Sequence, residues 1–180
     1  MTNPRGTASG CPSTNLEVLQ LRPTKSDRKN LIAHIEAAFP TQPIPAHLKL
    51  TKGDSEEAFS YDCIFGGRTW SSLLDAEFLW QNRAAMTFFV PDAFRYYIPA
   101  FMTISIRETR ASDLVPAEVI SAFTLPSDSG AAAQAMKLYR AFTKSQAAVI
   151  RDYLEFFAAW HEEGLDREAR KALRQFWAKG

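Results

Sequence analysis

The sequence predicts an all-α protein, a single compact domain of about six to seven helices with at most one short strand pair. Three observations lead to this fold class. Apolar residues recur at helical spacing in several separate segments, and few segments alternate between apolar and polar residues as strands do. The chain has 180 residues, about the length of one domain, and its 46% hydrophobic and 23% charged content is that of a globular protein.

The chain begins with a polar stretch, MTNPRGTASGCPSTN, that glycine and proline interrupt. This stretch has too few apolar residues to fold alone, and it lacks the apolar run of a secretion signal. We therefore expect a disordered leader over residues 1–22 and one helical domain over residues 23–180. No apolar run approaches the roughly 18 residues that would span a bilayer, so the expected location is the cytoplasm.

The first helix is expected over residues 26–39, where one apolar stripe contains Leu31, Ile32, Ile35, Ala38 and Phe39. The following FPTQPIP ends it, because proline lacks an amide donor. A second helix over residues 54–64 opens with acidic side chains, which suit the positive end of a helix dipole. After the turn FGGRT, WSSLLDAEFLWQN predicts a third helix, with inward side chains expected at Leu73, Leu74, Phe78 and Trp80.

The segment FFVPDAFRYYIPAFM, residues 88–102, predicts a helix with Pro91 in its first turn. Four apolar residues then recur at the spacing of one buried face: Phe94, Tyr97, Ile98 and Phe101. Pro99 should kink this helix or start another one. Three residues should point elsewhere, toward solvent or a neighbouring element: Asp92, Arg95 and Tyr96.

The C-terminal third is expected to hold a central helix and a last helix. Thr143 and Gln146 form a capping-box pattern, and the helix that they start should run to about Glu163 and stop at Gly164. Two apolar stripes cover most of its circumference: Ala147, Ile150, Leu154, Phe157, and beside them Val149, Tyr153, Phe156, Trp160. Asp166 should cap the last helix, whose inner stripe is Leu165, Ala169, Leu173, Phe176 and Trp177.

These faces predict one buried cluster that joins the two best-defined helices, formed by Phe94, Tyr97, Phe101, Ile150, Leu154 and Phe157. The two segments that most resemble strands are TISI, residues 103–106, and HLKLT, residues 47–51. Cys11 lies in the expected leader and Cys63 in an apolar run, where a small buried side chain fits. We therefore expect no disulfide and a protected thiol at Cys63.

Three parts of the sequence together resemble a bacterial domain family of unknown function. They are Trp70 after the glycine-containing turn, then FFVPDAFRYYIPAFM, then the distal FTKSQAAVIRDYLEFF. The family resembled has a Trp ahead of an FFxP[DE]AFRYY[LI]PA core, followed by a helix that begins TxxQ. The resemblance covers roughly residues 30–160 and implies a helical cytoplasmic domain, and it carries over no catalytic residue.

The sequence contains few patterns that indicate chemistry. GGRT is too short for a phosphate loop, there is no GxSxG elbow, and the three histidines lack the spacing of a zinc site. Residues 53–92 hold seven acidic and two basic residues. Four of the acids could gather around a divalent ion, although a solvated helix face is the simpler interpretation: Asp54, Glu56, Glu57 and Asp62. We expect no bound metal and no organic cofactor.

Three function classes remain. The first is a small bacterial binding protein with a protein partner, for example an immunity protein that neutralises a toxin. The second is an enzyme that uses carboxylates of the acidic segment with Arg95, and the third is a homo-oligomeric structural or regulatory subunit. The net charge of +1 and the separation of basic residues from aromatic ones indicate neither a nucleic acid nor a membrane as partner. The predicted partner surface contains Arg95, Tyr96, Asp92, Trp80, Arg83, Glu56 and Glu57.

Overall fold

A computed structural model of the chain describes residues 23–45, 47–160 and 164–179. Over these residues the fold is all-α, with nine α-helices and two short 3₁₀ helices, as the sequence predicts. The expected leader, residues 1–22, lies outside the described residues, and Cys11 with it. None of the described helices is both long enough and apolar enough to cross a membrane.

The helices are given in chain order. They are α1 (Lys25–Ala38), α2 (Glu56–Phe65), η1 (Trp70–Leu73), α3 (Ala76–Gln81), α4 (Ala85–Phe88), α5 (Pro91–Arg107), α6 (Val115–Ala122), α7 (Ser129–Arg140), α8 (Lys144–Ala158), α9 (Leu165–Gln175) and η2 (Trp177–Lys179). The helix predicted from Ser26 is therefore α1, and the one predicted from Pro91 is α5. Among the described residues the expected strand pair is reduced to one isolated bridge, between Thr51 and Phe89. The TISI segment is helical and belongs to α5.

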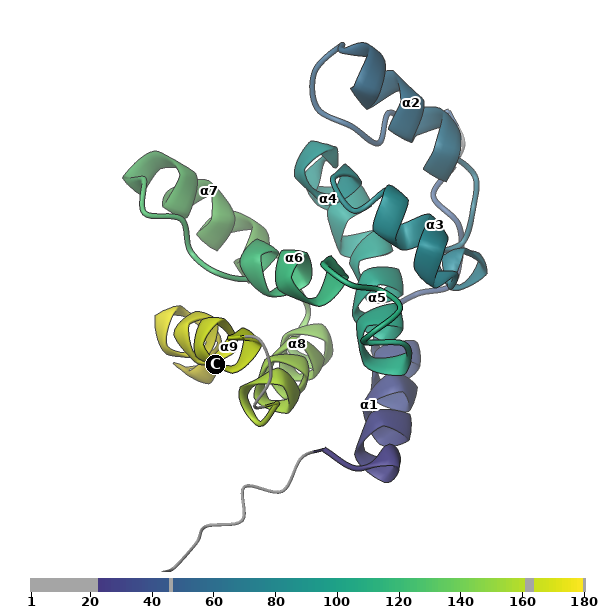
Figure 1. The fold of residues 1–180 in the computed structure, drawn as a ribbon. Helices are drawn as coiled ribbons and strands as arrows, with labels where there is room; N and C mark the ends of the chain where they lie inside the picture. The colour runs from purple at the N-terminus through teal and green to yellow at the C-terminus, as the bar shows by residue number, and fades with distance from the viewer. Residues whose placement is uncertain (1–22, 46, 161–163, 180) are drawn as a thin grey trace, which may run out of the picture.

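The central element is α5, and the other helices surround it. Figure 1 shows α1 below α5, the α2–α4 group above it, and α6 to α9 on the remaining side. Of its 17 residues, 13 are buried, among them all four that the sequence places on its inner face. Pro99 lies inside the helix and does not start a second one, because the preceding turn continues without interruption.

The predicted aromatic and aliphatic cluster is confirmed. All six of its predicted members, from α5 and α8, are buried in one core: Phe94, Tyr97, Phe101, Ile150, Leu154 and Phe157. Phe65, at the end of α2, packs its ring against those of Tyr97 and Phe101 at centroid distances of 5.3 and 6.4 Å. The Tyr97 hydroxyl also donates a hydrogen bond to the Phe65 carbonyl oxygen at 2.7 Å. Burial, with Tyr96 alongside, raises the pKa of Tyr97 to about 12, so this hydroxyl keeps its proton at neutral pH.

The third predicted helix is broken into two pieces. WSSL forms η1, and α3 begins after Asp75, whose carboxylate accepts a hydrogen bond from the Phe78 amide at 2.7 Å. Because α3 starts anew at this cap, its inward face does not continue the spacing of η1. The fully buried leucines of the two pieces are Leu73 and Leu79. The prediction of Leu74, Phe78 and Trp80 as inward side chains is therefore only partly right, since all three are half-buried.

The capping box of Thr143 and Gln146 is present at the start of α8. The helix ends at Ala158, earlier than predicted, and residues 161–163 lie outside the described residues. Gly164, at φ +77°, is the N-cap of α9, so Asp166 is not the cap. Asp166 is instead the second residue of α9, in its first turn, and its carboxylate pairs with Arg170 at 3.5 Å. The sequence patterns did not predict α6 and α7, nor the short α4.

Cys63 is exposed, which contradicts its predicted burial. The buried residues of α2 are Ala58, Tyr61 and Phe65. Because Cys63 follows Tyr61 by two positions, helical geometry turns it by about 200° to the outer side of α2. Phe59 lies on that outer side too and is 69% exposed.

Replacing Phe101 with alanine should lower the free energy of unfolding by about 3–5 kcal/mol, because its ring is completely buried among core side chains. Phe59→Ala is the matched control, since the same group is removed from the outside of α2. It should change that free energy by less than about 0.5 kcal/mol. Urea denaturation measures both variants, and similar losses for the two would contradict the assigned core.

The exposed thiol of Cys63 gives a second prediction. In the Cys11→Ser variant, the Cys63 thiol should react with an aromatic disulfide reagent almost as fast in the native protein as in urea, because its sulfur is open to solvent. Stopped-flow absorbance measures the two rates. A native rate that is slower by orders of magnitude would show that Cys63 is packed after all.

Candidate functional site

A groove of about 590 Å³ separates α7 from the junction of α4 and α5, and α6 lies beside it. We call it the α7 groove. Its volume is within the range of ligand-binding clefts in proteins, roughly 300–1,000 Å³. Figure 1 shows α7 extending outward from α6, away from the α8–α9 pair.

The first wall of the α7 groove is apolar and contains Met86, Phe89, Pro91 and Phe94, of which Pro91 is exposed and the other three are buried. A short extended contact fixes this wall. The amide of Val90 donates to the Leu50 carbonyl at 2.7 Å, and the amide of Lys52 donates to the Phe88 carbonyl at 2.6 Å. The second contact places Lys52 at the edge of the groove.

The second wall is α7, whose groove side carries Ala131, Gln134, Ala135 and Leu138. Asp128 starts this helix by accepting a hydrogen bond from the Ala131 amide at 2.7 Å. Of the twelve residues of α7, only Tyr139 is buried. This wall is therefore built of small and medium-sized side chains, of which Ala131 and Gln134 are exposed and Ala135 and Leu138 are half-buried.

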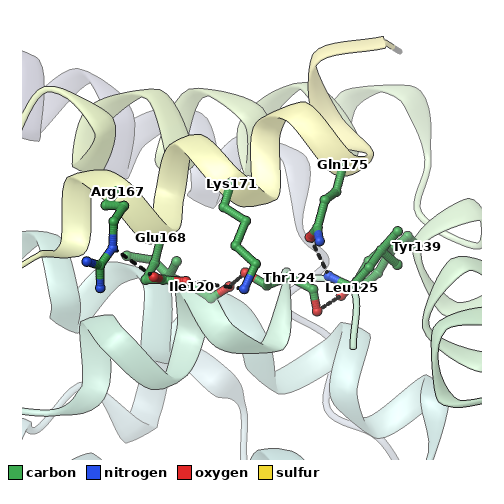
Figure 2. Close-up of polar contacts among 8 residues, drawn as sticks. All are labelled: Ile120, Thr124, Leu125, Tyr139, Arg167, Glu168, Lys171 and Gln175. Atoms are coloured by element: carbon green, nitrogen blue, oxygen red, sulfur yellow. Dashed lines mark hydrogen bonds and ion pairs between the residues drawn. The ribbon is translucent and has the colours of Figure 1, made fainter. Parts of the chain in front are cut away.

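Tyr139 anchors α7 at its C-terminal end. Its hydroxyl donates to the carbonyl oxygens of Ala122 at 2.8 Å and Thr124 at 3.3 Å, and burial raises the pKa of Tyr139 well above its ordinary value. Figure 2 shows Gln175 of α9 reaching the same loop, where its side-chain oxygen accepts a hydrogen bond from the Leu125 amide at 2.9 Å. The α6–α7 loop is thus held from two sides.

Three charged side chains lie around the groove. Lys52 and Lys137 stand on its two facing walls, and Glu118 belongs to α6. All three residues are exposed. Within the described residues, none of them takes part in an ion pair or a side-chain hydrogen bond. Their charges are therefore available to a molecule that enters the groove.

Two of the predicted partner residues, Asp92 and Arg95, lie at one end of this groove. The Arg95 guanidinium donates to the Asp92 carboxylate at 2.7 Å and to the carbonyl oxygen of Ala141 at 2.6 Å. Ala141 is the C-cap of α7 and lines the groove. The alternative in which Arg95 pairs with an acid of residues 54–77 is wrong. Arg95 instead holds the negative end of the α7 dipole against α5.

Tyr96 does not lie on the surface. Its ring is only 7% exposed and meets the ring of Tyr97 edge to face at a centroid distance of 4.8 Å. Burial raises the pKa of its hydroxyl. Tyr96 therefore packs against neighbouring elements in a second seam of α5, one of the two positions that helical geometry allows. It exposes little surface to a partner.

Trp80 and Arg83 form a separate group on the α3 side. The Arg83 guanidinium lies over the Trp80 ring at 5.2 Å and donates to the Trp80 carbonyl at 2.9 Å. The Trp80 indole N–H donates to the Asp113 carboxylate at 3.2 Å. Trp80 is bonded to Asp113, whereas Arg95 is bonded to Asp92 and Ala141, so the Trp80–Arg83 pair and Arg95 share no hydrogen-bond partner.

The four acids considered for a metal ion are engaged separately. Lys49 forms an ion pair with Asp54 and lowers the pKa of that carboxyl group. Asp62 accepts a hydrogen bond from the Leu50 amide at 2.8 Å, and Glu57 accepts one from the Tyr61 hydroxyl at 3.2 Å. Glu56 is exposed in the first turn of α2. In the described parts of the chain, no three His, Cys, Asp or Glu side chains lie where they could hold a metal ion together.

The α7 groove was not predicted from the sequence. One signal could have found its second wall: SDSGAAAQAMKLYR begins with an Asp cap and continues with a run of alanines, which favour a helix. No sequence pattern indicates that this helix would stand away from the core.

Comparisons with known proteins place the chain in a group without an assigned role. The sequence profile of a family of unknown function, DUF6714, matches residues 27–180. No curated protein matches the chain significantly, and no solved structure does. The match begins in the first turn of α1 and includes every later helix, so it covers both walls of the α7 groove.

Removing the Arg95 side chain should loosen the end of α7. We expect Arg95→Ala to cost about 1–2 kcal/mol of folding free energy, because a charge-assisted hydrogen bond to the Ala141 carbonyl is lost. Amides in the last turn of α7 should exchange with deuterium faster, while those of α8 stay protected. Asp92→Ala removes only an exposed carboxylate and should cost less than about 0.5 kcal/mol. Equal effects of the two variants would contradict this role of Arg95.

Proposed function

This chain belongs to the family of unknown function DUF6714, and we propose that it acts as a binding protein that holds a segment of a partner protein in the α7 groove. We also propose that it is bacterial and works in the cytoplasm, as the FRYYIPA core and the TxxQ helix start suggest. An immunity protein that neutralises a toxin is one form that this function could take.

The observation that carries the proposal is the poor burial of α7. A helix of 12 residues is marginal in water unless it packs against something. Within the described residues α7 packs through Tyr139, which is buried, and through Ala135 and Leu138, which are only partly buried. Its groove face, with Ala131, Ala135 and Leu138, lies opposite the large apolar side chains of the first wall. An apolar cleft with charged residues at its edge is typical of an interaction site.

The chemistry of the lining favours recognition over catalysis. Among the described residues that line the groove, the ionisable ones are Lys52, Glu118, Lys137 and Tyr139. The Tyr139 hydroxyl is already bonded to main-chain oxygens, and the other three are exposed side chains. An edge of solvated charges around an apolar floor suits the docking of a polypeptide better.

A pair of tryptophan substitutions tests the proposal. Ala131→Trp fills the groove, whereas Ala133→Trp adds the same ring to an exposed position of α7 that does not line it. The tagged full chain and both variants are expressed at equal levels in the native host, and bound proteins are quantified by mass spectrometry. We expect the wild type and Ala133→Trp to recover the same amount of a partner protein. Ala131→Trp should recover about tenfold less of it, or less still.

Circular dichroism and melting curves of the two variants serve as the control for folding, and they should agree with each other. Equal recovery of the partner by all three proteins would place binding elsewhere on the surface. If sedimentation shows a groove-dependent dimer and no other protein is enriched, the homo-oligomer is the better description.

A further inference from the structure

Granting the binding function proposed above, we infer that the occupant of the α7 groove is an amphipathic helix of the partner, with acidic residues on both edges of its apolar stripe. Three properties of the groove lead to this class of ligand: the secondary structure of its walls, the spacing of the side chains on α7, and the charges on its edges.

The walls of the groove have few unpaired main-chain amides or carbonyls that could bond to a ligand. Its helical walls bond their backbone amides and carbonyls internally, except at their ends. Two non-helical segments border the groove, and main-chain groups of both are paired. Lys52 and Val90 donate to Phe88 and Leu50. In the α6–α7 loop, the Thr124 carbonyl accepts from Tyr139 and the Leu125 amide donates to Gln175. Adding a β-strand from a partner requires a row of unpaired main-chain groups. The groove therefore recognises side chains, and a helix presents side chains without needing main-chain partners.

The groove side of α7 has the repeat of a helix-packing face. Ala131, Gln134, Ala135 and Leu138 fall at positions i, i+3, i+4 and i+7 and all line the groove. Twelve residues of α7 span about 18 Å, which matches a partner helix of about three turns. Small side chains on this wall let such a helix approach closely. On the facing wall Pro91 is exposed to it, while Phe89 and Phe94, at 1% and 4% exposed, form an apolar floor beneath.

The charges on the edges select the partner's polar residues. Lys52 and Lys137 come from the two facing walls, so a helix that lies between them has one ammonium group on each side. Neither lysine has an anionic partner among the described residues. Acidic side chains that flank the apolar stripe of the ligand would pair with both. Glu118 is the single acidic residue of the described lining, and it favours one basic residue where the ligand passes α6.

Selection from a library of random 16-residue peptides, displayed on phage, tests this inference with the full chain as bait. Peptides that also bind the Ala131→Trp variant are removed, so that only groove-dependent binders remain. We expect the enriched peptides to carry apolar residues at i, i+3 or i+4, and i+7, with an excess of Asp and Glu beside them. The best peptide, made synthetically, should gain helical circular dichroism when it binds.

Charge reversals then test the edges. Lys52→Glu and Lys137→Glu should each weaken binding of that peptide by about threefold or more, with a smaller effect at high salt. Lys29→Glu is the matched control, because Lys29 is an exposed lysine on α1 that does not line the groove. It should leave the affinity unchanged.

Several results would overturn the inference: enriched peptides without helical spacing, peptides with a basic excess, or an affinity indifferent to both reversals. A selection that yields no groove-dependent peptide would also overturn it. That failure is distinct from failure of the binding function, because a partner that still depends on an open groove in the co-purification experiment would uphold the function while excluding the acidic helix.

Discussion

The burial of α5 is the constraint on which the other helices depend. It presents buried side chains to several neighbours at once, and each neighbour is placed by a different set of them. On one side Tyr97 receives the end of α2 through the ring of Phe65 and the hydrogen bond to its carbonyl oxygen. On another, Phe94 meets Phe123 at the end of α6 at a centroid distance of 6.3 Å. A helix enclosed to this degree has few positions that are not buried: Pro91, Asp92 and Arg95 near its start, and Arg107 at its end.

The first turn of α5 lies between the buried core and the α7 groove. Pro91 and Phe94 line the α7 groove, and Arg95, one position further on, reaches across to the end of α7. The same turn therefore supplies the floor of the groove and the fastening of its outer wall. A largely buried inner wall facing a lightly packed outer one gives a cleft of fixed location whose width depends on few contacts.

The parts of the fold that the sequence predicts correctly are those set by local chemistry. The capping box at Thr143 and the inner face of α5 are written in residues three or four positions apart, and both are present. The errors have local and long-range causes. Asp75 interrupts an apolar pattern by capping a new helix. Cys63 lies two positions after the buried Tyr61, so the turn of α2 places it on the outer side.

For the candidate site, the sequence correctly predicts that Asp92 and Arg95 point away from the buried face of α5. It does not predict which groups they contact. The carbonyl of Ala141 is 46 residues away from Arg95, and a main-chain acceptor leaves no mark in the sequence. For Tyr96, a single buried stripe on α5 leaves two positions open, toward solvent or in a second seam with a neighbouring element. The neighbours of α5 bury nearly the whole circumference, which a single helix cannot reveal.

The α6–α7 loop has a further consequence for how the molecule responds to a ligand. Three side chains converge on it: Tyr139 from α7, Gln175 from α9, and Trp177, whose indole N–H donates to the Phe123 carbonyl at 2.9 Å. The outer wall of the groove and the C-terminal end of the chain are thus fastened to the same four residues of backbone. If the proposed ligand stabilises α7 and this loop carries the effect to the C-terminal end, thermodynamic linkage requires that loosening that end weakens ligand binding by the same factor. The last turn of α9 would then report occupancy of the groove, although it lies far along the chain from the side chains that line it.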